Sequence, residues 1–173
     1  SIERVRLADN SLTGGSFFHV SGYTGPATLV GSTAGNDSVK VVVDADVTLA
    51  NGNLRTSIGG SFALENVTNA IITGISLDNL FEVSSWTGTA AIAGGTGLDR
   101  VVSINDTNFV LSDTSLTRAS GGSFSLNQIR RVTLSGGAKA NTFNATAYTG
   151  NVWIYGGIGN DTLNGGFGDD YLD

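Results

Sequence analysis

The last eighteen residues combine closely spaced glycines with aspartates at a fixed position. Residues 156–164 and 165–173 each read G-G-x-G-x-D-x-U-x, in which U is a large apolar residue. Glycine permits positive φ angles, so a short loop can turn several backbone carbonyls toward one centre. The aspartate adds a carboxylate, and together these oxygens form the hard ligand shell that Ca²⁺ prefers. The pattern predicts calcium binding by Gly156, Gly157, Gly159, Asp161, Gly165, Gly166, Gly168 and Asp170.

Weaker copies of the same loop occur upstream. Residues 94–99 fit the six-residue pattern and end at Asp99, and residues 31–37 fit it with one inserted residue. Residues 136–141 form a degraded copy, in which Asn141 stands where Asp belongs and Lys139 adds a positive charge. An asparagine still offers a carbonyl oxygen, so Asn141 and Asp99 join the candidate metal ligands at weaker sites.

Three sequence markers repeat with a period of about 62 residues, which a search for self-similarity has to detect before strands are assigned. The markers are the aromatic pairs that begin at Phe18, Phe81 and Phe143, the aspartates Asp37, Asp99 and Asp161, and the Gly-Gly-Ser-Phe segments at 59–62 and 121–124. Since stacked repeats bury their apolar faces against one another, we expect equivalent residues, the three phenylalanines included, to stack one period apart.

Short apolar-alternating stretches, about ten residues apart, occur within each period. In the second period they lie near 81–83, 90–93, 101–104, 109–111, 124–126 and 132–134, bounded by Gly, Asn, Asp or Ser. Stretches of this kind predict strands of three to five residues. The regular period favours an all-β parallel solenoid (β-helix) of about 21 residues per coil, one third of the period, over a β-sandwich. The predicted repeats span about 12–74 and 75–136, with a partial repeat at 137–155, so that residues 1–155 are solenoid.

The C-terminal nonapeptides resemble the RTX, or haemolysin-type calcium-binding, repeats of secreted bacterial proteins. The whole period is also similar to the long tandem arrays of very large secreted or cell-surface bacterial proteins. The resemblance implies a right-handed parallel β-roll that starts at residues 156–173 and continues the solenoid. It implies calcium between loops on the same side of neighbouring coils, export, and folding driven by external calcium. The loop at 156 then pairs with 136–141, and the loop at 165 faces residues 148–150 on the opposite side.

Three aromatic residues suggest an alternative function. Tyr23, Trp86 and Tyr148 each precede Thr-Gly at equivalent positions, where they either pack as corner residues or form a sugar-stacking platform. The first reading makes the chain a structural or adhesive segment. The second makes it a carbohydrate-binding or polysaccharide-modifying β-helix. An ice- or crystal-binding surface is a third possibility, against which the absence of a regular Thr-x-Thr ladder argues.

Several function classes lack the residues they need. The 173 residues include one His, no Cys and a net charge of −6, which argues against thiol chemistry and against nucleic-acid binding. The three Glu and the single His19 do not form the grouped acids of a polysaccharide-cleaving site. No apolar run is long enough to span a membrane. The sequence therefore predicts a non-catalytic, secreted or cell-surface calcium-binding segment, with a glycan or cell-surface partner and end-to-end association of copies.

Overall fold

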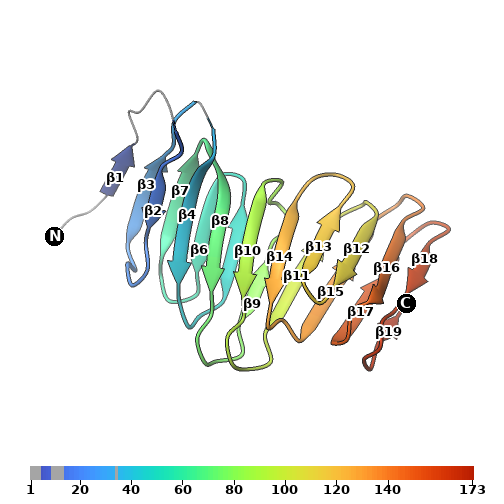
Figure 1. Cartoon of the computed structure of the whole chain (residues 1–173). Helices are drawn as coiled ribbons and strands as arrows, with labels where there is room; N and C mark the ends of the chain where they lie inside the picture. Colours follow the sequence, from blue (N-terminus) through green and yellow to red (C-terminus); the bar gives the residue numbers. More distant parts are fainter. Residues whose placement is uncertain (1–4, 9–13, 34) are drawn as a thin grey trace.

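The computed structural model describes residues 5–8, 14–33 and 35–173, and these residues form nineteen β-strands and no helix. The strands lie side by side along a single stack from the N-terminal to the C-terminal end (Figure 1). The prediction of an all-β chain is confirmed. Residues 12 and 13, where the first predicted repeat begins, and residue 34, within the predicted loop at 31–37, lie outside the described residues.

Two sheets divide the strands between them. Sheet A has ten strands in the spatial order β1 (Val5–Ala8), β3 (Pro26–Val30), β7 (Ser61–Glu65), β6 (Asn53–Thr56), β5 (Val47–Ala50), β9 (Leu80–Glu82), β11 (Arg100–Ile104), β15 (Arg131–Ser135), β17 (Asn151–Tyr155) and β19 (Tyr171–Leu172). Sheet B has nine, in the order β2 (Phe17–His19), β4 (Asp37–Val42), β8 (Val67–Thr73), β10 (Thr89–Ala93), β14 (Ser123–Asn127), β13 (Ser115–Arg118), β12 (Phe109–Ser112), β16 (Thr142–Ala147) and β18 (Thr162–Asn164).

Parallel pairing between neighbouring coils sets the length of one coil. Asn69 of β8 pairs with Thr89 of β10, and Arg131 of β15 pairs with Asn151 of β17, an offset of 20 residues in both cases. One coil thus contains a strand in each sheet and two corners. We call the corners that lead from sheet A to sheet B the A-to-B edge, and the others the B-to-A edge. The observed coil is close to the predicted length of about 21 residues.

Two antiparallel hairpins interrupt the parallel stack, so the sheets are mixed. In sheet A, β5 pairs antiparallel with β6, and β6 with β7; in sheet B, β12, β13 and β14 repeat this arrangement. The turn between β5 and β6 is Asn51-Gly52, a dipeptide typical of two-residue hairpin turns. The prediction of exclusively parallel strands was wrong here, because it did not include this turn signal.

Equivalent residues of the 62-residue repeat lie on opposite sheets. Phe18 is in β2 of sheet B, Phe81 in β9 of sheet A, and Phe143 in β16 of sheet B. The chain changes sheet five times between one equivalent strand and the next, and an odd number of changes ends on the other sheet. The predicted column of these three phenylalanines is therefore wrong. Phe143 instead stacks on Phe109 of the neighbouring strand, with ring centroids 5.0 Å apart.

This alternation keeps the two sheets nearly equal in height. Each hairpin adds two strands to its sheet, which lengthens that side of the stack by roughly 10 Å at the usual strand spacing. The first hairpin enters sheet A and the second enters sheet B, so the sheets reach ten and nine strands. Two consecutive repeats thus compensate each other, and the core between the sheets stays continuous.

The core is formed by the alternate residues that point between the sheets. Strand β14, for example, buries Phe124 and Leu126 and exposes the three residues on either side of them. The largest fully buried side chains include five phenylalanines, namely Phe62, Phe81, Phe109, Phe124 and Phe143. Since each coil buries its apolar face only against its neighbours and the opposite sheet, stability is carried by contacts between adjacent coils.

The 62-residue period persists in hydrogen bonds along the edges of the stack. Asp44 Oδ1 accepts hydrogen bonds from the N–H groups of Ser76 and Leu77, at 3.0 and 2.8 Å. One period later, Asp106 Oδ1 accepts from the N–H of Lys139 at 3.1 Å. In the same way Asn51 and Asp113 each accept from the threonine that follows the corner aromatic residue, Thr87 or Thr149.

We expect the Asp44 carboxyl group to titrate below its ordinary pKa, because the N–H of Leu77 and the Ser76 hydroxyl donate to its ionised form. A pKa lower in the folded than in the unfolded state stabilises the fold above the unfolded value, and this contribution is lost as the pH falls through the folded value. An NMR pH titration of the Asp44 carboxyl carbon measures this directly. Ser76→Ala should raise the Asp44 pKa, and a pKa unaffected by this substitution would contradict the assignment.

Candidate functional site

Five six-residue loops with one shared geometry form much of the two edges. Each begins with Gly and ends with Asp or Asn, and we call them corner loops. They are 74–79, 94–99 and 165–170 on the B-to-A edge, and 136–141 and 156–161 on the A-to-B edge. The sixth side chain folds back over the first glycine, so that a Cβ atom at Gly156 would lie 2.7 Å from Asp161 Oδ2. Only glycine fits at this first position.

Each sixth-position aspartate holds the preceding coil through its Oδ1 atom. Asp161 accepts a hydrogen bond from the N–H of Asn141 at 2.7 Å, and Asp99 accepts one from the N–H of Asn79 at 2.9 Å. Asp170 and Asp37 do the same, with the N–H groups of Val152 and Ser16 as donors. The aspartate spacing noticed in the sequence thus has a structural role, since these carboxylates connect adjacent coils.

Loops 136–141 and 156–161 stack directly on each other. The N–H of Ile158 donates to the carbonyl of Gly137 at 2.7 Å, and the N–H of Thr162 donates to that of Asn141 at 2.9 Å. This is the pairing that the sequence predicted for the loop at 156. Gly157 and Gly159 have φ angles of 93° and 137°, which only glycine adopts readily, and which bring their backbone close to the carbonyls of the lower loop.

The stacked pair brings together oxygen atoms suited to a hard cation. The carbonyls of Gly137 and Lys139 approach the upper loop, and the Asp161 carboxylate lies between the two loops. The charge of Lys139 is directed elsewhere, because its ammonium group lies 3.8 Å from Asp106 and is largely exposed. No group of three or more His, Cys, Asp or Glu side chains occurs within residues 5–8, 14–33 and 35–173. A cation at this edge would therefore draw most of its ligands from the main chain.

The loop at 165 lies on the opposite edge, as the sequence predicted. It connects β18 in sheet B to β19 in sheet A, and the N–H of Phe167 donates to the carbonyl of Tyr148 at 2.9 Å. The predicted partner segment 148–150 thus faces it. Both carboxylate oxygens of Asp170 already accept hydrogen bonds, Oδ1 from Val152 and Oδ2 from the N–H of Gly166 at 2.7 Å. This loop is braced by protein donors alone.

Loops 94–99 and 74–79 stack farther up the B-to-A edge. Asp99 is fully buried, and burial raises the pKa of its carboxyl group. The sequence analysis included Asp99 among the metal candidates but missed the loop that pairs with it, which ends at Asn79. Gly74 and Asn79 were the available signal, because they stand one period before Gly136 and Asn141.

The three aromatic residues proposed as a sugar-stacking platform do not share a surface. Trp86 and Tyr148 are 1% and 0% exposed, and only Tyr23 reaches 37%. Their polar atoms bond to nearby carbonyls, the Trp86 indole N–H to that of Thr89 and the Tyr148 hydroxyl to that of Ile129. Burial corrects the platform hypothesis for these residues, since a corner of the stack packs large rings inside it.

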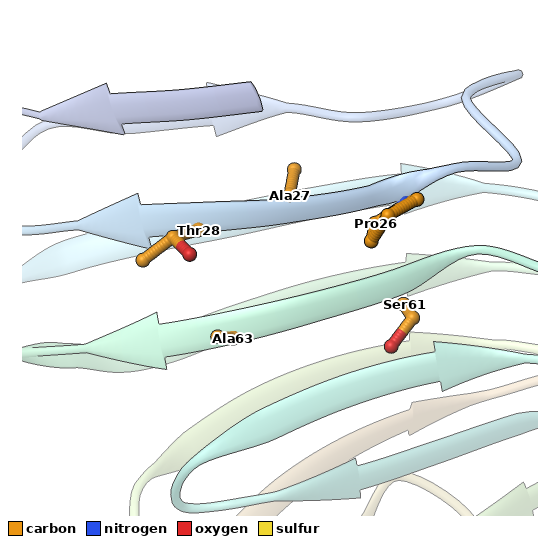
Figure 2. A pocket seen from close by; sticks show the side chains of 5 residues that line it. All are labelled: Pro26, Ala27, Thr28, Ser61 and Ala63. Atoms are coloured by element: carbon orange, nitrogen blue, oxygen red, sulfur yellow. The ribbon is translucent and has the colours of Figure 1, made fainter. Parts of the chain in front are cut away.

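The acid–base side chains are dispersed over the described part of the stack. His19 lies on the exterior and hydrogen-bonds to Ser21 Oγ at 2.7 Å. Figure 2 shows a hollow where β3 and β7 run side by side, lined by Pro26, Ala27, Thr28, Ser61 and Ala63, none of which is ionisable. No helix in the described residues is long and apolar enough to cross a membrane.

The fold and its edges define an all-β repeat protein whose stacked coils are connected by glycine–aspartate corner loops. Residues 135–172 match the family of RTX calcium-binding nonapeptide repeats, with four copies of the repeat. The C-terminal part of the chain thus carries RTX repeats, which bind Ca²⁺, and the resemblance seen in the sequence is confirmed. The match includes loop 136–141, which the sequence analysis treated as a degraded copy. No curated protein matches the chain.

Proposed function

We propose that the chain is a non-catalytic, calcium-binding structural segment of a large secreted or cell-surface bacterial protein, in which it serves as an adhesive or spacer rod. The observation that carries the proposal is the stacking of loops 136–141 and 156–161 within the matched repeats. An ion between them joins two coils that otherwise share only hydrogen bonds. Calcium would therefore stiffen the C-terminal end of the rod.

The architecture that we infer is a right-handed parallel β-solenoid in which two hairpins are inserted. Repeats at about 12–74, 75–136 and 137–155 form residues 1–155, and residues 156–173 continue the stack as an RTX-type β-roll. The 20-residue parallel offsets and the matched repeats support this assignment. RTX repeat proteins are generally secreted, which supports an extracellular location, and the absence of Cys is compatible with it.

The calcium ligands that we propose come from both edges, with unequal contributions. Asp161, Asn141, Gly156, Gly157 and Gly159 belong to the stacked A-to-B pair. The loop at Gly165, Gly166, Gly168 and Asp170 contributes less, since its carboxylate is already held by two N–H groups. A glycan or cell-surface partner and end-to-end association of copies remain proposals, which a glycan array and light scattering at increasing concentration test.

We expect millimolar Ca²⁺ to raise the melting temperature relative to a chelator. An extracellular-type site with a Kd of about 10⁻⁴–10⁻³ M adds roughly 2–3 kcal/mol when Ca²⁺ is raised well above the Kd. Differential scanning calorimetry of the full chain in the two buffers measures the effect, with Mg²⁺ as the control ion. Identical curves in Ca²⁺ and chelator would refute the calcium part of the proposal.

Asp161→Asn should remove most of this calcium response and leave the fold intact, because Asn already occupies the sixth position of loops 74–79 and 136–141. Asp113→Asn is the charge-matched control. Asn51 makes the same hydrogen bonds one repeat earlier, so this substitution should leave the calcium response unchanged. An equal loss in both variants would indicate a general charge effect rather than a site.

A further inference from the structure

Two buried oxygen atoms on the B-to-A edge have no hydrogen-bond partner. They are Asp99 Oδ2 and Asn79 Oδ1, on residues that are 0% and 3% exposed. The residues lie in neighbouring coils, since the N–H of Asn79 donates to the other oxygen of Asp99 at 2.9 Å. A buried oxygen without a partner is costly, and a buried carboxylate oxygen especially so. These two atoms therefore indicate a missing interaction at one place.

Other sixth-position aspartates satisfy the same oxygen within the protein. Asp37 Oδ2 accepts from the hydroxyl of Ser32 at 3.2 Å, and Asp170 Oδ2 accepts from the N–H of Gly166 at 2.7 Å. Loop 94–99 provides no such donor to Asp99. The difference is local to this loop, because the Oδ1 contact is the same in all three cases.

The atoms around the two unpartnered oxygens are themselves acceptors. A Cβ atom at Gly94 would lie 2.5 Å from Asp99 Oδ2 and 2.6 Å from the carbonyl oxygen of Gln128. A Cβ atom at Gly74 would lie 2.4 Å from Asn79 Oδ1 and 2.2 Å from the carbonyl oxygen of Gly94. Two side-chain and two main-chain oxygens thus line the same side of the glycine backbone, and only a positively charged ligand suits all four.

The local charges also favour a cation. Asp78, in the lower loop, is exposed, and its negative charge raises the pKa of Asp99 further, whereas Arg130 acts in the opposite direction. Asp78 Oδ1 accepts from the N–H of Leu98 at 2.8 Å, which holds this second carboxylate against the upper loop. The corner therefore offers carboxylate, amide and carbonyl oxygens, the set that Ca²⁺ prefers.

We propose that loops 74–79 and 94–99 bind one Ca²⁺ ion through Asp99 Oδ2 and Asn79 Oδ1, with the carbonyls of Gly94 and Gln128 as further ligands. The site lies outside residues 135–172 and does not depend on the C-terminal loops. It provides the middle of the rod with a calcium link of its own, on the edge opposite to that of loops 136–141 and 156–161.

The test is a calcium titration of the full chain by calorimetry, in variants that separate the two regions. The double variant Asp161→Asn/Asp170→Asn should keep a calcium isotherm, which comes from the middle site. Adding Asp99→Asn should weaken that remaining isotherm at least about tenfold, because affinity depends on ligand charge. Asp37→Asn is the matched control, and it should leave the isotherm unchanged, since Ser32 already satisfies its second oxygen.

An NMR titration of the same double variant should shift the amide signals of Asn79 and Asp99 as calcium is added. A double variant that binds no calcium would overturn the middle site, as would an isotherm insensitive to Asp99→Asn. The latter result would assign the unpartnered oxygen to a protonated Asp99. Failure of the proposed function would look different, because the double substitution would then leave the calcium response of the natural chain unchanged.

Discussion

Replacing Arg118 with Ala should lower the free energy of unfolding by about 3 kcal/mol, because buried acceptors lose their only charged donor. The guanidinium is buried and donates to the carbonyls of Val83, Ser84, Trp86 and Gly121. Burial lowers the pKa of Arg118, and the charge of Glu82 opposes this effect. For a chain of this length the melting temperature should fall by roughly 6–12 °C, as thermal denaturation would measure.

The first repeat supplies a rescue experiment for this prediction. Arg118 also bonds to Ser103 Oγ and Asn105 Oδ1, at 3.0 and 2.6 Å. The residues one period earlier are Thr56, Val41 and Val43, and both valines are buried. The polar cluster of the second repeat thus replaces an apolar one in the first.

We therefore expect Arg118→Thr alone to destabilise the chain and Ser103→Val with Asn105→Val to restore part of the loss. Pairs of apolar groups can replace buried hydrogen-bonded groups at little cost, whereas one unpaired partner is costly. A triple variant less stable than Arg118→Thr would show that the cluster depends on its carbonyl contacts rather than on these two side chains.

Gly136→Ala should destabilise the chain and abolish the C-terminal calcium response together. The new Cβ atom would lie 2.2 Å from the carbonyl oxygen of Gly156 and 2.6 Å from Asn141 Oδ1, so loops 136–141 and 156–161 have to separate. Overpacking of this kind costs roughly 1–3 kcal/mol. Calorimetry in Ca²⁺ and in chelator measures both effects in one experiment.

Gly52→Ala is the control, because a Cβ atom at Gly52 meets nothing within 4 Å. Gly136 and Gly52 both lack the positive φ angle that an L residue avoids, so the comparison isolates the steric contact. We expect Gly52→Ala to leave the calcium response unchanged. If Gly136→Ala kept a normal response, the stacked pair would not be the calcium site.

The alternating pattern and the glycine–aspartate spacing made the local elements predictable. All six stretches predicted in the second period correspond to strands, from β9 to β15, and only β13 was missed. The loops at 156 and 165 lie on opposite edges, as the nonapeptide length requires. These features depend on side-chain alternation and on glycine conformations, which are properties of short segments.

The arrangement of the repeats in space was not predictable from the period alone. A 62-residue repeat is compatible with three full coils or with five half-coils and a hairpin, and only the second places equivalents such as Phe81 and Phe143 on opposite sheets. The choice depends on whether segments such as β6 pair antiparallel with their neighbours. That pairing is decided by contacts between strands.

The sequence by itself determined that the chain is all-β, that it repeats, and that its C-terminal loops have calcium ligands. Tertiary structure decided which carboxylates are satisfied, so that Asp170 is held by two N–H groups and Asp99 retains an unpartnered oxygen. It also decided that Trp86 and Tyr148 are buried. The physical reason is that hydrogen-bond satisfaction and burial depend on the neighbouring coil, which lies 20 residues away in the sequence in most of the stack.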